Sequence, residues 1–351
     1  MTTWLLTGGA GYIGAHVIRE LQSSGRSVVV LDDLSSGVRE NVPSDVPLIV
    51  ASVADREAVT AALQEHKVDG VIHLAAKKAA GESVHMPLYY YDENVAGTQA
   101  LLGAMNDAGV TNFVYSSSAA VYGTPASNPV SEDFPLNPES PYGETKVVGE
   151  WLARGMGIAH GFSWVALRYF NVAGAGSDAL GDRSVNNLVP MVFRALSIGE
   201  RPKVFGDDYP TPDGSCIRDY VHVADLAAAH VAAAARCETG GRAESFNVGR
   251  GQGSSVLEVM SMISEVIGTD VNAQIVGRRA GDPPACFAVT AKIESELGWK
   301  ATRDLRDMVT SAWSAWQAAH LRRPSGGLLS GDLGGLTSGT IDDHLLGFGE
   351  S

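Results

Sequence analysis

A tyrosine and a lysine four positions apart are the side chains of this sequence best suited to acid–base chemistry. Tyr142 and Lys146 stand in the run Ser-Pro-Tyr-Gly-Glu-Thr-Lys at residues 140–146. Residues four apart share one face of a helix, so the Lys146 ammonium would lie near the Tyr142 phenol and favour its ionised form. A phenol with an ordinary pKa of about 10 is otherwise a poor base at neutral pH. Together with a cofactor that accepts hydride, such a pair can oxidise an alcohol to a ketone.

Three serines at residues 116–118 follow a strand-like run. The Ser118 hydroxyl could hold a substrate oxygen and relay its proton to Tyr142. Taken alone, serines after a strand are usually a loop cap, and a tyrosine after proline is usually part of a turn. The catalytic interpretation therefore depends on a cofactor motif elsewhere in the chain.

That motif is the glycine loop Gly-Ala-Gly-Tyr-Ile-Gly at residues 9–14, which follows a strand-like run and opens a helical pattern. Its glycines allow a tight turn and let backbone N–H groups approach a pyrophosphate. Asp32 comes 21 residues after Gly11, at the end of the second predicted strand, where a carboxylate can bind ribose hydroxyls. A 2′-phosphate would meet Asp32 and Asp33 with no adjoining arginine, which favours NAD over NADP. The alternative is a glycine-rich turn in an unrelated α/β protein.

The elements that must position these residues alternate between strands and helices, as a Rossmann-type doubly wound parallel sheet requires. Such a sheet brings the carboxyl ends of its strands to one edge, where ligands bind. We predict strands at residues 4–7, 27–31, 70–74, 112–117 and 164–169, and helices at 12–23, 55–66, 87–108 and 141–160.

The chain divides into three parts by pattern. Residues 1–170 form the predicted NAD-binding Rossmann domain, to which later segments can return, and residues 171–320 form mainly a smaller mixed α/β domain for the substrate. Within it we predict helices at 188–197, 224–235 and 255–267, the last with Ser255 and Glu258 as a capping box. Residues 321–351 are rich in Gly, Ser, Leu and Asp without periodicity, which predicts a flexible and dispensable tail.

Composition excludes several classes of function. A formal net charge of -14 argues against a nucleic-acid or anionic-membrane surface. The three cysteines are widely separated and the nine histidines show no ligand spacing, so we expect free thiols and no metal site. The absence of a signal segment, and of any apolar run near the roughly 20 residues that span a bilayer, predicts a cytoplasmic protein.

Taken together, the motifs resemble those of the extended short-chain dehydrogenase/reductases. Within that superfamily the chain is most similar to the UDP-glucose 4-epimerase family, the galactose epimerases, over about residues 2–320. Besides the glycine loop and the Tyr142/Lys146 pair, the matching segments are 73–78, 81–84, 116–123, 167–171, 186–188, 205–209, 217–222 and 278–282.

The resemblance implies reversible epimerisation at C4 of UDP-galactose and UDP-glucose. A tightly bound NAD would take part, the intermediate would be a 4-keto sugar, and the enzyme would be a homodimer built on helices 87–108 and 141–160. It implies Ser118, Tyr142 and Lys146 as catalytic residues. For the cofactor it implies Gly8, Gly11, Tyr12, Ile13, Gly14, Asp32, Asp33, Ser52, Lys78, Asn94, Tyr142, Lys146 and Tyr169. For the UDP-hexose it implies Ser118, Tyr142, Asn171, Asn187, Leu188, Phe205, Arg218, Tyr220, Arg279, Asp282 and Cys286.

The sequence departs from the family pattern at two sites. Ser52 replaces an aspartate that often meets the adenine amino group, and Ala120 replaces a frequent threonine. At Cys286 the family carries either a bulky tyrosine or a small residue. A cysteine leaves room for a C2 substituent, which predicts activity on UDP-N-acetylglucosamine and UDP-N-acetylgalactosamine as well; the alternative is a small core residue remote from the sugar.

Three rival functions remain. A sugar-nucleotide 4,6-dehydratase would need acidic residues just after the serine run, where this chain has Ala119 and Ala120. A decarboxylase would need a site for a sugar carboxylate, which the sequence does not reveal. A non-catalytic NAD-sensing protein could share the fold, but proteins of that type typically lose the tyrosine or the lysine.

Overall fold

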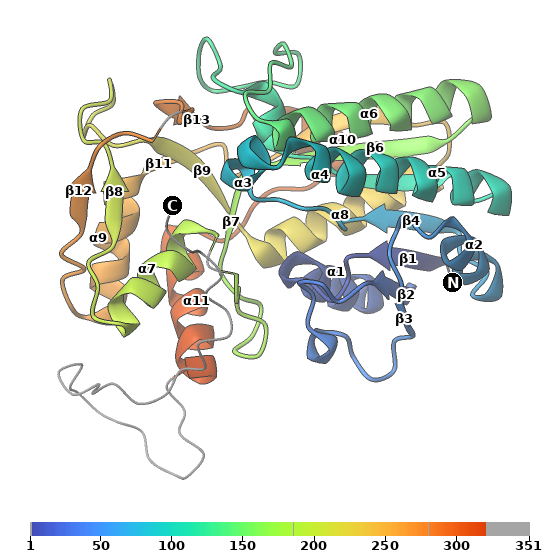
Figure 1. Ribbon diagram of the computed structural model, residues 1–351, viewed down its shortest axis with the longest axis horizontal. Helices are drawn as coiled ribbons and strands as arrows, with labels where there is room; N and C mark the ends of the chain where they lie inside the picture. The colour runs from blue at the N-terminus through green and yellow to red at the C-terminus, as the bar shows by residue number, and fades with distance from the viewer. Residues whose placement is uncertain (1, 185, 280, 321–351) are drawn as a thin grey trace.

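A computed structural model describes residues 2–184, 186–279 and 281–320 of the chain. Its main feature is a seven-stranded, fully parallel sheet in the order β10-β6-β5-β4-β1-β2-β3 (Figure 1). The strand order reverses at β1 and β4, which is where doubly wound sheets bind their ligands. The strands are β1 (Thr3–Thr7), β2 (Ser27–Asp32), β3 (Leu48–Val50), β4 (Gly70–His73), β5 (Asn112–Ser116), β6 (Ser163–Tyr169) and β10 (Ala243–Val248).

Helices cover both faces of this sheet, because its strands alternate their apolar side chains between two cores. Trp4 and Leu6 face one core, which they share with α1 and α8, whereas Leu5 faces the other, which contains α2, α5 and α6. The predicted Rossmann fold is confirmed. These helices are α1 (Tyr12–Ser23), α2 (Arg56–Glu65), α5 (Gly97–Ala108), α6 (Pro141–His160) and α8 (Val223–Glu238).

Helix α6 has the bounds that the sequence predicts, and its ends explain why. The Ser140 hydroxyl accepts a hydrogen bond from the Gly143 N–H, and Pro141 occupies the first turn. Gly161 ends the helix in a left-handed conformation with φ of 72°. These caps fix the register of the helix and hence the positions of Tyr142 and Lys146.

The helix predicted at residues 87–108 has the expected bounds, but its middle is π-helical. The structure has α4 (Pro87–Tyr90), a π-helical segment (Tyr91–Ala96) and then α5, preceded by the short helix α3 (Ala80–His85). The wider π turn accompanies an inward-pointing Asn94, which is buried against the loop after β4 and against α6.

The second half of the chain builds its own core beside the carboxyl edge of the large sheet (Figure 1). Ser255 and Glu258 form the predicted capping box at the start of α9. Strand β10, which the sequence analysis missed, returns to the large sheet beside β6. The elements here are β7 (Asn171–Ala173), α7 (Leu188–Ser197), β8 (Lys203–Phe205), β9 (Ile217–His222), β11 (Gly253–Ser255), α9 (Val256–Ile267), β12 (Gln274–Val276), β13 (Ala285–Cys286), α10 (Ala291–Leu297) and α11 (Leu305–His320).

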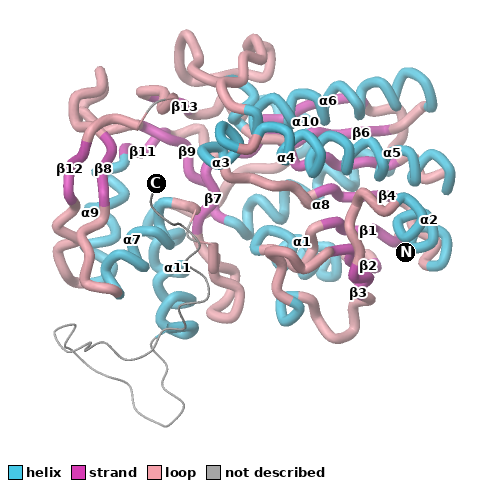
Figure 2. The backbone as a smooth tube through the Cα atoms, in the orientation of Figure 1, coloured by secondary structure: helices cyan, strands magenta, loops and turns pink. Residues whose placement is uncertain are grey.

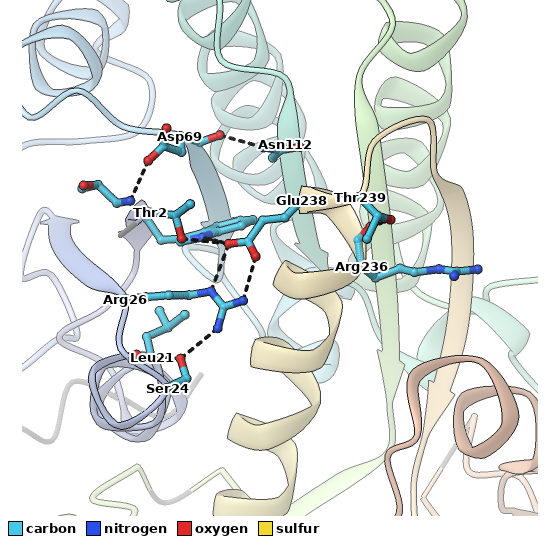
Figure 3. A network of polar contacts seen from close by, with 11 residues as sticks. Thr2, Leu21, Ser24, Arg26, Asp69, Asn112, Arg236, Glu238 and Thr239 are labelled. Atoms are coloured by element: carbon cyan, nitrogen blue, oxygen red, sulfur yellow. Dashed lines mark hydrogen bonds and ion pairs between the residues drawn. The ribbon is translucent and has the colours of Figure 1, made fainter.

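Polar contacts also tie α8 to the start of the sheet (Figure 3). The Glu238 carboxylate accepts hydrogen bonds from Thr2, the Trp4 indole and Arg26. A long segment between Tyr122 and α6, drawn mostly as loop in Figure 2, crosses to the second half and pairs with it at Val130. The predicted tail at 321–351 lies outside the described residues.

Candidate active site

The structure brings Ser118, Tyr142 and Lys146 together at the carboxyl end of β5. Tyr142 and Lys146 are buried one turn apart on α6, and the Lys146 Nζ lies 5.8 Å from the centroid of the Tyr142 ring. Ser118 is the N-cap of a 3-10 turn (Ala119–Tyr122), and its hydroxyl lies near enough to the Tyr142 phenol to lower the pKa of that phenol. The Lys146 ammonium donates to the Ser116 carbonyl at 2.8 Å. A proton acceptor, a relay and a fixed cation therefore share one corner of the sheet.

Burial sets the electrostatics of this corner. It raises the pKa of Tyr142 above its ordinary value, and the nearby Ser118 hydroxyl opposes that shift. Burial also lowers the pKa of Lys146 to about 8, so the amine remains mostly protonated at pH 7. The sequence reasoning that Lys146 lowers the pKa of the phenol missed desolvation, which raises the pKa of Tyr142 and lowers that of Lys146 in the protein alone.

The glycine loop forms a cradle suited to a dinucleotide. Gly8 has φ of 71°, and a Cβ there would lie 2.6 Å from the Ala75 nitrogen; a Cβ on Gly14 would lie 2.5 Å from the Gly8 oxygen. Helix α1 starts after Gly11, which has no side chain to cap it, so its first N–H groups face outward as an anion site. A diphosphate fits this arrangement.

The carboxylate of Asp32 ends β2 beside that cradle. It is buried and accepts hydrogen bonds from the backbone N–H groups of Ala10 and Leu34. Burial raises the pKa of this carboxyl, while the two backbone hydrogen bonds oppose the shift. A buried acceptor suits the hydroxyls of a ribose and opposes a 2′-phosphate. The residues present thus fit NAD.

Other predicted cofactor residues use their side chains within the protein. The Tyr12 hydroxyl donates to the Gly174 carbonyl, and Ile13 packs against the core, so both would offer a cofactor their backbone. Asp33 accepts from Ser35, and the Ser52 hydroxyl accepts from the Ala54 N–H.

Lys78 and Asn94 lie on the loop after β4 and in the π-helical segment. The Lys78 ammonium reaches Ser184 at 3.3 Å. The Asn94 amide accepts from the Lys77 N–H and donates to the Lys77 carbonyl and to Thr145. Three of its hydrogen bonds are therefore internal, and it joins the cofactor loop to the catalytic helix.

A cluster of fixed charge lies on the second half of the chain. Arg279 makes two contacts of 3.0 Å with the Asp282 carboxylate, which Arg218 approaches at 3.4 Å. The Arg279 guanidinium also lies 5.5 Å from the centroid of the Phe205 ring. One carboxylate opposes two guanidinium groups, so the cluster keeps a net positive charge that can bind a diphosphate.

The remaining predicted substrate residues differ in exposure. Asn171 is exposed at the start of β7, whereas Tyr220 is buried in the core of the second half. Asn187 is the N-cap of α7 and donates to Asp182, and Leu188 opens that helix. Tyr169 ends β6, and burial, followed by the charge of Tyr142, raises the pKa of its phenol.

Strand β9 links the charged cluster to Cys286. In the register of β9 with β13, Arg218 is the partner of Cys286. The Cys286 side chain is buried in a cluster with Val121, Tyr122 and Phe170, next to the turn that Ser118 caps. On the opposite face of β9, Asp219 accepts from the backbone N–H groups at positions 250, 251 and 288.

Two buried residues near the catalytic pair escaped the sequence analysis. The Ser83 hydroxyl accepts from the Tyr142 N–H at 3.1 Å and so anchors the first turn of α6. Glu150 lies on α6 four residues after Lys146 and accepts from Ser117 at 2.6 Å. The spacing of 142, 146 and 150 was the signal that could have found Glu150.

Comparison with known proteins agrees with this geometry. The model of the family described as "NAD dependent epimerase/dehydratase family" matches residues 4–249. The chain belongs to this family. A UDP-glucose 4-epimerase of Azospirillum brasilense is 44% identical over 318 residues, 89% of this chain and 91% of the relative. A Drosophila melanogaster enzyme of the same name is 42% identical, covering 90% of this chain and 96% of its own.

Solved structures of family members superimpose closely. The UDP-glucose 4-epimerase of Stenotrophomonas maltophila, crystallised with NAD and formylated UDP-arabinopyranose, has a TM-score of 0.87 at 41% identity, covering 91% of this chain and 99% of that one. The UDP-Glc/GlcNAc 4-epimerase of Campylobacter jejuni has a TM-score of 0.80 at 36% identity, covering 90% and 100%. Among the helices of the described residues, none combines the length and apolar character that a bilayer crossing requires.

Proposed function

We propose that this protein is an NAD-dependent UDP-glucose 4-epimerase. The observation that carries the proposal is the trio of half-buried Ser118 with buried Tyr142 and Lys146, which lies at the sheet edge between a dinucleotide cradle and a cluster of arginines. Enzymes with this name, 42–44% identical over nine-tenths of the chain, support the same activity. NAD+ would supply a hydride acceptor that takes the hydride from C4 of the sugar and returns it, so the reaction has no net redox change.

The protein's own residues handle the proton. The Tyr142 phenolate accepts the proton of the sugar 4-hydroxyl, and the nearby Ser118 hydroxyl relays it. The Lys146 ammonium stabilises the phenolate, and its bond to the Ser116 carbonyl keeps it in place. When the 4-keto sugar is reduced, the Tyr142 hydroxyl returns the proton.

The UDP group anchors the substrate while the sugar turns over to expose its other face. Arg218 and Arg279 supply the charge for the diphosphate, and Phe205 and Leu188 supply apolar surface beside it. We propose that residues 1–170, with later segments such as β10, bind the cofactor and that residues 171–320 mainly bind the UDP-sugar. The remaining cofactor and substrate residues named from the resemblance stay proposals on the same basis.

We further propose that the substrate range includes the N-acetylated pair. Cys286 is small and buried beside the Ser118 turn. Burial raises the pKa of its thiol to about 11, so it is neutral at pH 7 and suits a spacer better than a nucleophile.

A homodimer is part of the proposal. Helix α4 lies beside α6 (Figure 1). Trp151 and Ile158 lie seven residues apart on α6 and are 61% and 78% exposed, and Leu88 of α4 is 78% exposed. Large apolar side chains gathered on adjacent helices indicate an interface. Light scattering should show a dimer for the wild type and a monomer for the double variant Trp151→Asp/Ile158→Asp; a monomeric wild type would contradict the proposal.

Residence in the cytoplasm stays a prediction of the sequence.

One incubation tests the function against its rivals. Purified protein is mixed with UDP-galactose and no added cofactor. We expect UDP-glucose, because the bound NAD is regenerated in each turnover. A stable keto-deoxy sugar would indicate a 4,6-dehydratase instead, and no change despite bound NAD would indicate a non-catalytic protein.

A further inference from the structure

A third side chain follows the catalytic pair along α6. Glu150 is eight residues after Tyr142 and four after Lys146, and like them it is buried. The mechanism above gives it no role. A buried carboxylate is costly unless it is paired, so its partners indicate what it does.

Glu150 is held by an arginine and holds a serine. Arg168 on β6 donates to it twice, from Nε to Oε1 at 2.9 Å and from Nη2 to Oε2 at 2.7 Å. The Ser117 hydroxyl donates to Oε1 at 2.6 Å. Such a bidentate pair fixes the orientation of the carboxylate. Because a buried ion pair contributes little net stability, we infer the role of Glu150 from the groups that its carboxylate contacts.

That position controls the backbone around Ser118. Lys146 holds the carbonyl of Ser116, and Glu150 holds the hydroxyl of Ser117. The two residues just before Ser118 are thus attached to the helix that carries Tyr142. The distance between the Ser118 hydroxyl and the phenol depends on both attachments.

The Arg168 guanidinium also contacts the buried cluster that contains Cys286. Its Nη1 donates to the Tyr122 hydroxyl at 2.9 Å, and that hydroxyl donates to Asn247 at 2.7 Å. Asn247 in turn donates to the carbonyl of Val130, whose N–H bonds the Phe287 carbonyl beside Cys286. One buried network therefore connects α6, the serine turn and the segment that carries Cys286.

We propose that Glu150, oriented by Arg168, is a positioning residue for epimerisation: through Ser117 it sets the place of Ser118 relative to Tyr142. This inference rests on the proposed function. It assigns Glu150 and Ser117 an effect on turnover and none on the binding of UDP.

The test compares two serines that bond the same carboxylate. Ser117 lies in the turn before Ser118, whereas Ser245 lies on β10 and donates to Oε2 at 3.3 Å. Ser117→Ala and Ser245→Ala each remove one hydroxyl and leave the ion pair intact. For the NAD-loaded full chain, kcat and KM for UDP-galactose are measured, with NAD content and melting temperature as checks of folding.

We expect Ser117→Ala to lower kcat by tenfold to a hundredfold, since small displacements of reacting groups cost about that much, with KM within about twofold. Ser245→Ala should keep both constants within about twofold. Three outcomes would overturn the inference. They are a smaller fall in kcat for Ser117→Ala, an equal fall in kcat for both variants, and a change in KM without a change in kcat. If Ser117→Ala does not fold, Glu150→Gln is judged by the same criteria. An inactive wild type would instead overturn the proposed function.

Discussion

Replacing Lys146 by methionine should stabilise the protein at neutral pH while it removes activity. The difference between an ordinary pKa of 10.5 and one of about 8 means that burial of the charged amine costs the folded state about 3 kcal/mol, at 1.36 kcal/mol per pH unit. Against this, methionine leaves the buried Ser116 carbonyl without the donor that Lys146 supplies, which costs the variant about 2 kcal/mol whether the amine is charged or neutral. Lys146→Met therefore gains the desolvation free energy and loses the hydrogen bond to Ser116. The difference leaves the variant about 1 kcal/mol more stable at pH 7.

The sign of this difference should change with pH. Because the folded pKa lies below the unfolded one, the unfolded chain keeps a proton between pH 8 and 10.5 that the folded chain has released, so wild-type stability rises with pH there. By pH 9.5 it should have gained about 2 kcal/mol, which makes the variant the less stable by about 1 kcal/mol.

Urea unfolding at pH 7 and pH 9.5, with both proteins stripped of NAD so that a difference in cofactor affinity does not contribute, measures the two differences. Lys300→Met is the matched control, since that side chain is 74% exposed, and it should change stability by less than about 0.5 kcal/mol at either pH. A variant that is less stable than wild type by the same amount at both pH values would refute the reasoning. The kcat of Lys146→Met should fall at least tenfold, because the Tyr142 phenolate loses the neighbouring cation.

Three further outcomes are expected. Tyr142→Phe should keep the fold and the bound NAD yet lose at least about a hundredfold in kcat, and near-normal turnover would exclude Tyr142 as the base. Cys286→Tyr should abolish turnover of the N-acetylated sugars and spare UDP-galactose in a paired assay; equal losses on both, or a wild type inactive on the N-acetylated pair, would contradict the role given to Cys286. A chain that ends at His320 should keep its melting temperature and activity, whereas a drop of several degrees would show that residues 321–351 contribute to the fold.

Local signals in the sequence predict the bounds of a helix wherever a capping residue or a turn sets its end. The start of α9 follows from Ser255 and Glu258, and α6 follows from Ser140, Pro141 and Gly161. Strand β10 was not predicted, because its pairing with β6 joins residues about 80 positions apart and no local sequence pattern indicates such a pairing. The pKa of Tyr142 escaped for a related reason: burial comes from the assembled fold, and spacing along one helix reveals only the attraction from Lys146.

The register of β9 and β13 limits how this site can change. Arg218 and Cys286 are partners in that register, while Asp219 on the other face holds the segments at 250, 251 and 288 in place. A single residue inserted in β9 before Arg218 would turn Asp219 toward the face of Cys286 and Arg218 toward the backbone N–H groups that Asp219 now binds, whereas one inserted in β13 before Cys286 would turn Cys286 away from the face of Arg218. On the role proposed for Cys286, substrate preference can change by side-chain replacement at position 286, whereas a change in the length of either strand would misplace Arg218 or Cys286.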